Sequence, residues 1–296
     1  MNGLRFRYRP VNEVMHEIES CGARTISIND ADFFGTPERP KELMRALKGS
    51  GISWQAGVTS KLAGDDEMLE LAAESGCTML SIGFESISRA TLKSVHKHVN
   101  RPETFAALVE KVHSYGIMVF GLFIFGFDGD DASVFDETVN FNITAKYDAV
   151  AYSALTPYPG TLTWHEMKKA NRINSYDWSL YDQGHVVYRP AQMSVNELRV
   201  GLCKTYHSFY SPSSIARRFP WRGTRHRTQW LVYNSFMRKG SKMLNSYSIP
   251  SATLEPDFTP IPPIMPAKRE WREAVLEQHE KPPPTSLDRL PAPLVR

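Results

Sequence analysis

The residues best suited to chemistry are acidic and amide side chains that follow short apolar runs. Glu85 ends the run LSIGFE, residues 128–131 (DGDD) follow GLFIFGF, and the run TISI is followed by Asn29, Asp30 and Asp32. A charge is costly to bury, so its place at the end of a buried run indicates either solvent or a ligand. Groups of this kind can orient a polar ligand. We therefore predict a small-molecule site here, with solvated strand ends as the alternative.

The elements that would position these side chains repeat one pattern. A helical spacing of apolar residues ends at a glycine, and a continuous apolar run follows; the four glycines are Gly22, Gly51, Gly76 and Gly116. Glycine caps helix ends, and continuous apolar runs are typical of parallel strands covered on both faces. Five parallel strands are expected to start near residues 24, 53, 77, 117 and 148. In such an α/β sheet or barrel the ligand site lies at the carboxyl ends of the strands, so Glu85 and Asp30 should face one mouth.

Composition narrows the class of protein. The 296 residues are 42% hydrophobic with a net charge of +3, which predicts a soluble globular protein without a general attraction to polyanions. The three cysteines are far apart and form neither a disulfide framework nor a metal motif, and the histidines of HKH, His96 and His98, are predicted to be solvated. Because no signal peptide and no apolar stretch of about 18 residues is present, we expect a cytoplasmic protein without a membrane span.

The pattern changes after residue 175. Residues 176–248 are expected to form a mainly helical extension, in which Ser194 caps one helix. Residues 198–254 contain ten Lys or Arg and no acidic residue, with aromatic residues interleaved. The stretch 199–242 therefore predicts weak contact with an anionic membrane surface or a nucleic acid, or alternatively a helical appendage that packs its aromatic residues on the barrel. The proline-rich residues 249–296 are predicted to be disordered.

Four segments together resemble the radical S-adenosylmethionine (SAM) enzymes: SIGFESIS, GLFIFGFDGDD, LTPYPGTL and WSLYDQGHVVYRP. The resemblance covers roughly residues 5–215 and is greatest to the cobalamin-binding branch, which includes hopanoid and other lipid methylases. It implies that residues 1–175 form a partial (β/α)6 barrel, similar to a TIM barrel, that lacks its first strand.

The resemblance also implies a set of SAM-binding residues. The family's third-strand glutamate binds the ribose, and Glu85 in GFES matches it; a carboxylate there can accept hydrogen bonds from two vicinal hydroxyl groups. Lys93, Lys97 and Arg101 would rim this site. The methionine amino group would lie near Asn29, Asp30 and Asp32. The adenosine would be flanked by Gly121, Gly126 and, through backbone contacts of TPYPG, Pro157.

The family's other cofactors have no ligands in this chain. Members bind a [4Fe–4S] cluster through C-x-x-x-C-x-x-C, a spacing that this sequence does not contain, and the branch also binds cobalamin. The chain is thus expected to be a truncated fragment, one half of a split enzyme completed by an N-terminal polypeptide, or a degenerate relative. The first two predict a methyltransferase-like protein inactive alone, with a small or lipid-like substrate that the sequence does not identify. The third predicts a non-catalytic nucleotide-binding or interaction protein.

Overall fold

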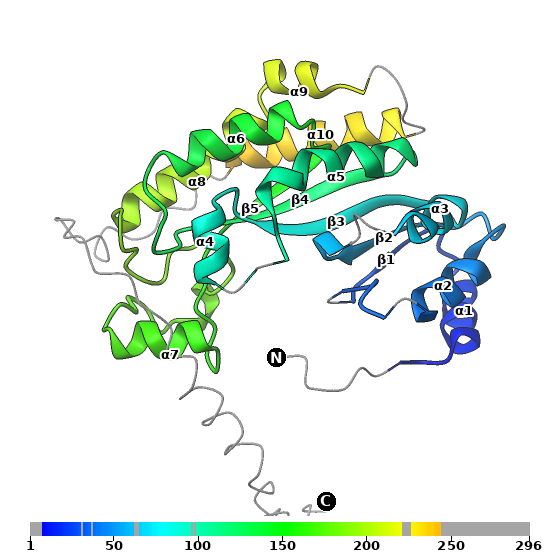
Figure 1. Ribbon diagram of the computed structural model, residues 1–296, viewed down its shortest axis with the longest axis horizontal. Coiled ribbons are helices and arrows are strands. Elements are labelled where there is room, and N and C mark those ends of the chain that lie inside the picture. Colours follow the sequence, from blue (N-terminus) through cyan, green and yellow to red (C-terminus); the bar gives the residue numbers. More distant parts are fainter. Residues whose placement is uncertain are drawn as a thin grey trace, which may run out of the picture.

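The protein contains one parallel sheet that curls into a partial barrel (Figure 1). The computed structural model describes residues 8–30, 32–36, 38–61, 65–95, 97, 99–220 and 226–243. The strands follow the order of the chain and are β1 (Thr25–Ile28), β2 (Ser53–Val58), β3 (Cys77–Glu85), β4 (Met118–Phe125) and β5 (Ala149–Ala154). Each begins within one residue of its predicted start, so the predicted α/β fold is confirmed.

The helices lie between and after the strands. They are α1 (Val11–Ser20), α2 (Glu38–Leu47), α3 (Asp66–Glu74), α4 (Arg89–Ser94), α5 (Pro102–Ser114), α6 (Val134–Thr144), α7 (Leu162–Lys169), α8 (Val195–Phe209), α9 (Pro212–Arg218) and α10 (Arg227–Met243). Gly22, Gly76 and Gly116 follow helix ends with positive φ angles, as predicted, whereas Gly51 lies four residues after the end of α2. Gly76 shows why: a Cβ there would lie 2.3 Å from the Ile52 carbonyl oxygen, so no larger residue fits.

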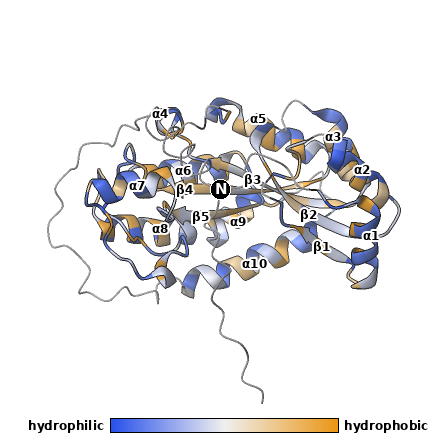
Figure 2. Ribbon diagram, turned by 90° about the horizontal axis from the view of Figure 1, so that it is seen from below, coloured by the Kyte–Doolittle hydropathy of each residue, from blue (hydrophilic) through white to orange (hydrophobic). Residues whose placement is uncertain are grey.

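The two faces of the sheet are covered differently. Alternate residues of β3, such as Leu80 and Phe84, are buried under the outer helices, where Phe84 packs edge-on against Phe105 of α5. On the opposite face, Met79 of β3 and Met118 of β4 pack against Trp230 of α10. Helices α5 and α10 therefore lie on opposite sides of the sheet (Figure 2). Helix α10 covers the inner face near the amino ends of the strands and leaves the carboxyl end of β3 uncovered by this contact.

Helix α8 seals the outer edge of β5. The Tyr210 hydroxyl accepts a hydrogen bond from Val150 N–H (3.0 Å) and donates to Val150 O (2.7 Å). Tyr206, one turn earlier, makes the same pair of bonds with Tyr152 (2.9 and 3.0 Å). A strand edge normally exposes such groups to other chains. The aromatic residues of α8 thus complete the sheet, as the appendage alternative predicted for this stretch.

A buried arginine anchors the last helices. Arg218 donates to the backbone oxygens of Tyr147 (2.9 Å) and Phe209 (3.0 Å) and to Asn234 Oδ1 (3.0 Å). Burial lowers the pKa of Arg218 to about 10, so it stays charged at neutral pH. The segment after residue 176 therefore shares a continuous hydrophobic core with the sheet, to which Leu198 also contributes. The predicted cap at Ser194 is confirmed, and it forms a capping box with Glu197.

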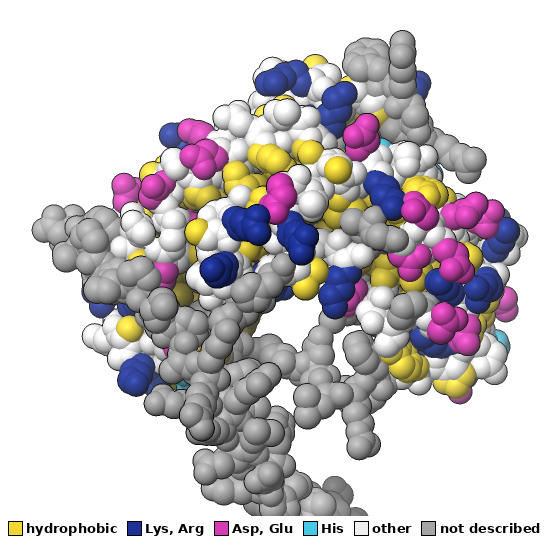
Figure 3. All heavy atoms as spheres, viewed as in Figure 1, with side chains coloured by type: hydrophobic (Ala, Val, Ile, Leu, Met, Phe, Trp, Pro, Cys, Tyr) yellow, Lys and Arg dark blue, Asp and Glu magenta, His cyan; other side chains and the backbone are white. Residues whose placement is uncertain are grey.

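The outer surface carries charges of both signs. On the face shown in Figure 3, acidic and basic side chains alternate over α2 and α3, where ion pairs join Lys41 to Glu67 (2.7 Å) and Lys48 to Glu74 (2.8 Å). In the described part of the chain, no helix has the length and apolar character needed to cross a bilayer. The predictions for His96, His98 and residues 249–296 lie outside the described residues.

Candidate functional site

Glu85 occupies an unusual backbone position at the carboxyl end of β3. Gly83 pairs with Leu122 of β4 and Glu85 with Phe123, so Phe84 is an extra residue and forms a β-bulge. Glu85 itself has φ = 66°, in the left-handed region. This conformation costs a residue other than glycine about 1–3 kcal/mol and can mark a functional site, although Lys146, Asn171 and Gln183 share it. The bulge turns the Glu85 side chain across the inner face.

The Glu85 carboxylate is held among polar groups rather than released into solvent. Its side chain is 16% exposed, and Lys97 Nζ lies 3.1 Å from Oε1. A Cβ at Gly83 would lie 3.0 Å from the same oxygen, so Gly83 allows the carboxylate to fold back over the strand. Lys97 is 54% exposed. This pair therefore presents one negative and one positive group at the carboxyl end of the sheet.

The residues after β1 lie at the same edge of the sheet. Asp32 accepts hydrogen bonds from the backbone N–H and the hydroxyl of Thr59, both at 3.2 Å, just beyond β2. Asn29 and Asp30 are exposed. The strands are parallel, and their register places Ile28, at the end of β1, level with Leu80, so β3 extends five residues further, to Glu85. The structure thus places Asp30 and Glu85 at one end of the sheet, as expected.

The three residues expected to flank adenosine lie in different surroundings. Gly121 is in the middle of β4, where a Cβ would lie 2.7 Å from the Tyr147 ring, so it faces the helix layer rather than the strand ends. Gly126 follows β4 with φ = 96°, and its carbonyl accepts the Tyr188 hydroxyl. Pro157 is buried just after β5. Gly121 therefore has a packing role, and the structure does not bring it to the carboxylates.

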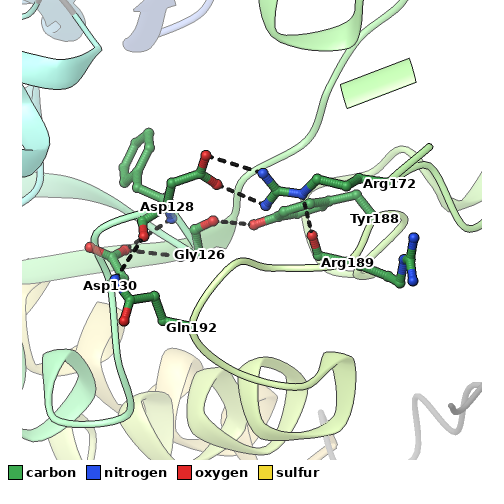
Figure 4. A network of polar contacts seen from close by, with 8 residues as sticks. Gly126, Asp128, Asp130, Arg172, Tyr188, Arg189 and Gln192 are labelled. Atoms are coloured by element: carbon green, nitrogen blue, oxygen red, sulfur yellow. Dashed lines mark hydrogen bonds and ion pairs between the residues drawn. The ribbon is translucent and has the colours of Figure 1, made fainter. Parts of the chain in front are cut away.

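The acidic segment 128–131 is bound to the protein itself (Figure 4). Arg172, fully buried, donates from both terminal nitrogens to the Asp128 carboxylate (2.7 and 3.1 Å). Asp130 accepts the backbone N–H of Gly126 (3.0 Å) and of Phe127 (3.1 Å). These contacts fix the loop after β4. The functional interpretation of this acidic cluster is thereby replaced by a structural one, because its carboxylates are used within the fold.

Asp130 is the most perturbed of these carboxyls. Its exposed fraction is 2%, and burial raises its pKa to about 6. The backbone N–H groups and the Thr91 hydroxyl (3.2 Å) partly oppose that increase, because they stabilise the charged form. Asp130 therefore responds to mildly acidic pH from within the loop.

A cavity of about 260 Å³ lies beside the edge of β5. Its lining includes Asp182 and His185, both in the segment that resembled the family after the barrel. His185 Nδ1 lies 2.9 Å from the Asp182 carboxylate. Partial burial raises the pKa of Asp182, but the hydrogen bonds from His185 and two backbone N–H groups outweigh it and lower the pKa overall. Tyr181 instead donates to the Ser175 carbonyl (2.7 Å) and serves the loop.

The cysteines do not converge on the Glu85 end of the sheet. Cys21 is exposed just after α1, Cys77 is buried at the amino end of β3, and Cys203 lies in α8. Burial raises the pKa of Cys77 far above its usual range, which disfavours the thiolate that binds iron. Within the described residues, no group of three or more His, Cys, Asp or Glu could hold a metal ion. The residues present therefore do not fit an iron–sulfur cluster.

Two residues that the sequence did not indicate support the Glu85 position. Asn100 donates to the carbonyls of Gly83 and Phe84 within the bulge, and Ser60 donates to Asn100. Both are common polar residues in loops, so no local pattern distinguishes them.

Comparison with known proteins identifies the domain that carries this site. Residues 2–141 match the model of the Radical SAM superfamily. This chain contains a radical SAM domain. It is 34% identical over 247 residues to bacteriochlorophyllide d C-12(1)-methyltransferase of Chlorobaculum tepidum, a match covering 80% of this chain and 53% of that protein. It is 26% identical over 211 residues to hopanoid C-3 methylase of Methylococcus capsulatus, covering 70% of this chain and 40% of that one.

A solved structure supports the fold of this radical SAM domain. The methyltransferase TsrM from Kitasatospora setae, with cobalamin and a [4Fe–4S] cluster bound, superimposes with a TM-score of 0.54 over 80% of this chain and 56% of that chain. The sequence identity is 15%, so this likeness concerns the fold alone. The chain spans about half the length of the curated relatives it matches.

Proposed function

We propose that this chain binds SAM at the carboxyl end of β3 and is the SAM-binding part of a cobalamin-type radical SAM methyltransferase. The observation that carries the proposal is Glu85, held in a left-handed conformation by a bulge with its carboxylate on the inner face. A carboxylate there can accept hydrogen bonds from both ribose hydroxyls. The similarity to curated methyltransferases supports the reaction class.

The remaining strand-end residues suit the other groups of SAM. Asp32 is already engaged with Thr59, so the exposed Asn29 and Asp30 are left to meet the methionine ammonium. Lys97 has three N–H donors, so it can stay bonded to Glu85 and also pair with the methionine carboxylate. In this proposal Gly121 contributes by letting Tyr147 pack closely beneath the sheet.

The described residues do not provide ligands for the cluster or for cobalamin. In the family the cluster provides the electron that cleaves SAM, but the three cysteines here are too dispersed to hold it. In this proposal the ligands of both groups belong to polypeptide outside these 296 residues, such as a complementing N-terminal chain, and the present chain is inactive alone.

Isothermal titration of the purified chain with SAM tests the proposal. We expect measurable binding by the wild type and at least a tenfold loss in Glu85→Gln, equivalent to about 1.4 kcal/mol. Glu74→Gln is a matched control, because Glu74 is an exposed partner of Lys48 at the end of α3, next to the amino end of β3. Absence of SAM binding, or equal affinity in the Glu85 and Glu74 variants, would reject the proposal. SAM binding that stays uncoupled from any reaction after a cluster-bearing partner is added would favour the non-catalytic alternative.

We also propose that the exposed side of α10 contacts an anionic membrane surface. Val232 and Phe236 are 65% and 70% exposed there, and Arg238, Lys239 and Lys242 belong to the same helix. Apolar side chains flanked by cations are typical of helices that lie on anionic lipid. In a sedimentation assay, the wild type should pellet with phosphatidylglycerol vesicles, whereas Phe236→Ser should stay in the supernatant. Equal sedimentation of both proteins would reject this contact, as would binding to DNA but not to vesicles.

A further inference from the structure

We propose that Asn100 is a positioning residue that sets the direction of the Glu85 carboxylate and thereby the selectivity of the site for a ribose with both hydroxyl groups. The inference rests on the proposed SAM site and extends it to residues that do not touch the ligand.

The contacts of Asn100 converge on the bulge. Its side-chain amide donates to Gly83 O (3.0 Å) and Phe84 O (2.9 Å), the two carbonyls that precede Glu85. Asn100 is 7% exposed, so these bonds are shielded from water. The Phe84 carbonyl also accepts the Ser86 N–H (2.8 Å), which closes a tight turn around Glu85, and Asn100 adds a side-chain donor to this turn. The amide therefore stabilises the backbone shape that puts Glu85 into the left-handed region.

A second bond fixes Asn100 itself. Ser60, just beyond β2, donates to Asn100 Oδ1 at 2.6 Å. Because the carbonyls of Gly83 and Phe84 can only accept, the NH2 group faces the bulge and the oxygen faces Ser60. The end of β2 thus helps to hold the amide, and through it the end of β3.

The same turn also acts on the carboxylate. Asn100 N–H donates to Lys97 O (3.0 Å), and Lys97 Nζ lies 3.1 Å from Glu85 Oε1. Lys97 therefore contacts the Glu85 side chain, while Asn100 contacts the two backbone carbonyls that precede Glu85. A carboxylate held in this way can be aimed at a pair of hydroxyl groups, whereas a freely rotating one would bind either hydroxyl alone.

A purely structural role for Asn100 predicts a different result. Satisfying two buried carbonyls would contribute to folding stability alone, and its loss would leave ligand selectivity unchanged. Asn234 provides the matched control. It is 1% exposed and its amide also donates to two backbone oxygens, of Asp148 and Trp230, both at 3.0 Å, on the α10 side of the sheet.

The experiment compares the Kd of SAM with the Kd of its 2′-deoxyribose analogue, by titration calorimetry at a temperature well below the unfolding midpoint of each variant. The wild type is expected to bind SAM about tenfold more tightly than the analogue, because the analogue leaves the Glu85 carboxylate without the 2′-hydroxyl donor. Asn100→Ala should reduce the preference to less than threefold, and Ser60→Ala should reduce it partially. Asn234→Ala should lower the melting temperature but keep the tenfold preference.

The outcomes separate the two proposals. If Glu85→Gln abolishes the preference and Asn100→Ala retains it, the positioning role is overturned while the SAM site stands. If the wild type shows no preference or no binding, the proposed SAM site fails and the positioning role fails with it.

If Asn100→Ala does not fold, Ser60→Ala and Gly83→Ala replace it in the test. The Cβ added in Gly83→Ala would lie 3.0 Å from Glu85 Oε1 and so displace the carboxylate. A wild-type preference for SAM in both variants would overturn the positioning role. The double variant Glu85→Gln/Asn100→Ala should show no further loss of preference beyond Glu85→Gln, because both changes act on one contact.

Discussion

The guanidinium of Arg172 binds both carboxylate oxygens of Asp128, at 2.7 and 3.1 Å, across 44 residues of sequence. Its Nε also donates to Arg189 O (2.8 Å), so all three nitrogens of a fully buried side chain have partners. The pair joins the loop after β4 to the segment after α7 (Figure 4). It therefore uses within the fold an acidic side chain that follows β4.

Arg172→Gln should destabilise the protein by about 3 kcal/mol, because it leaves Asp128 and the Arg189 carbonyl without the charged donor. The free energy of unfolding in urea, measured at pH 7, tests this. Arg89→Gln is the control, since its ion pair with Glu103 is exposed and worth less than about 1 kcal/mol. If both variants lose a similar free energy of unfolding, the buried ion pair stabilises the protein no more than the exposed one does.

Asp130 should make stability fall as the pH rises through the mildly acidic range. The unfolded carboxyl titrates near pH 3.9, whereas burial raises the folded pKa to about 6. Between these values the native state binds the extra proton, so the contribution of Asp130 to the free energy of unfolding is greatest at low pH and is lost as the pH passes 6. Asp130→Asn lacks this titration. The wild-type value minus the variant value should therefore drop by roughly 1–3 kcal/mol between pH 4 and pH 7; a constant difference would contradict the raised pKa.

Tyr210→Phe should cost about 2 kcal/mol, because the N–H and the carbonyl of Val150 lose a shared partner in a buried place. Tyr115→Phe removes a hydroxyl that bonds Asp66 at the surface and should cost much less. Equilibrium unfolding of both variants makes the comparison. If Tyr115→Phe lowers the free energy of unfolding as much, the effect comes from removing any tyrosine hydroxyl and not from the hydrogen bonds at the edge of β5.

Anaerobic reconstitution of this chain alone with iron and sulfide should not give a stoichiometric [4Fe–4S] cluster, nor 5′-deoxyadenosine from SAM under dithionite. The reason is the number of ligands that can converge, since Cys77 is buried at the amino end of β3 and Cys203 lies in α8. Iron analysis with visible and EPR spectra, and product chromatography, give the answer. About four irons per chain together with product would mean that these cysteines can meet.

The strands could be predicted because their signals are local. A glycine after a helical repeat and a continuous apolar run are both contained in about 20 residues, so Gly76 and the start of β3 were identified together. The side of the strand that a residue faces was harder to predict. Gly121 belongs to a glycine-containing strand of a ligand-binding barrel, yet Tyr147 fills the space beside it.

The site was only partly predictable because its support comes from distant residues. Glu85 is conspicuous as a charge at the end of an apolar run, but none of the residues next to it in the sequence predicts a bulge or a left-handed backbone. The acidic residues at 128–131 gave the same signal as Glu85 and proved to be internal, since Arg172 is 44 residues away. Without the partner, a carboxylate that binds a ligand and one that binds the fold have the same sequence pattern.

The tyrosines on the outer edge of β5 also limit how this protein can assemble. The groups of Val150 and Tyr152 are saturated by Tyr210 and Tyr206, and the Ala154 N–H bonds Gln183 O (2.8 Å). Among the described residues β1 forms the opposite border of the sheet and pairs with β2 alone. Two copies that joined β1 to β1 about a twofold axis would present only saturated borders. Because head-to-tail growth needs two adhesive borders on each subunit, pairing of sheet edges in such an arrangement would stop at two copies.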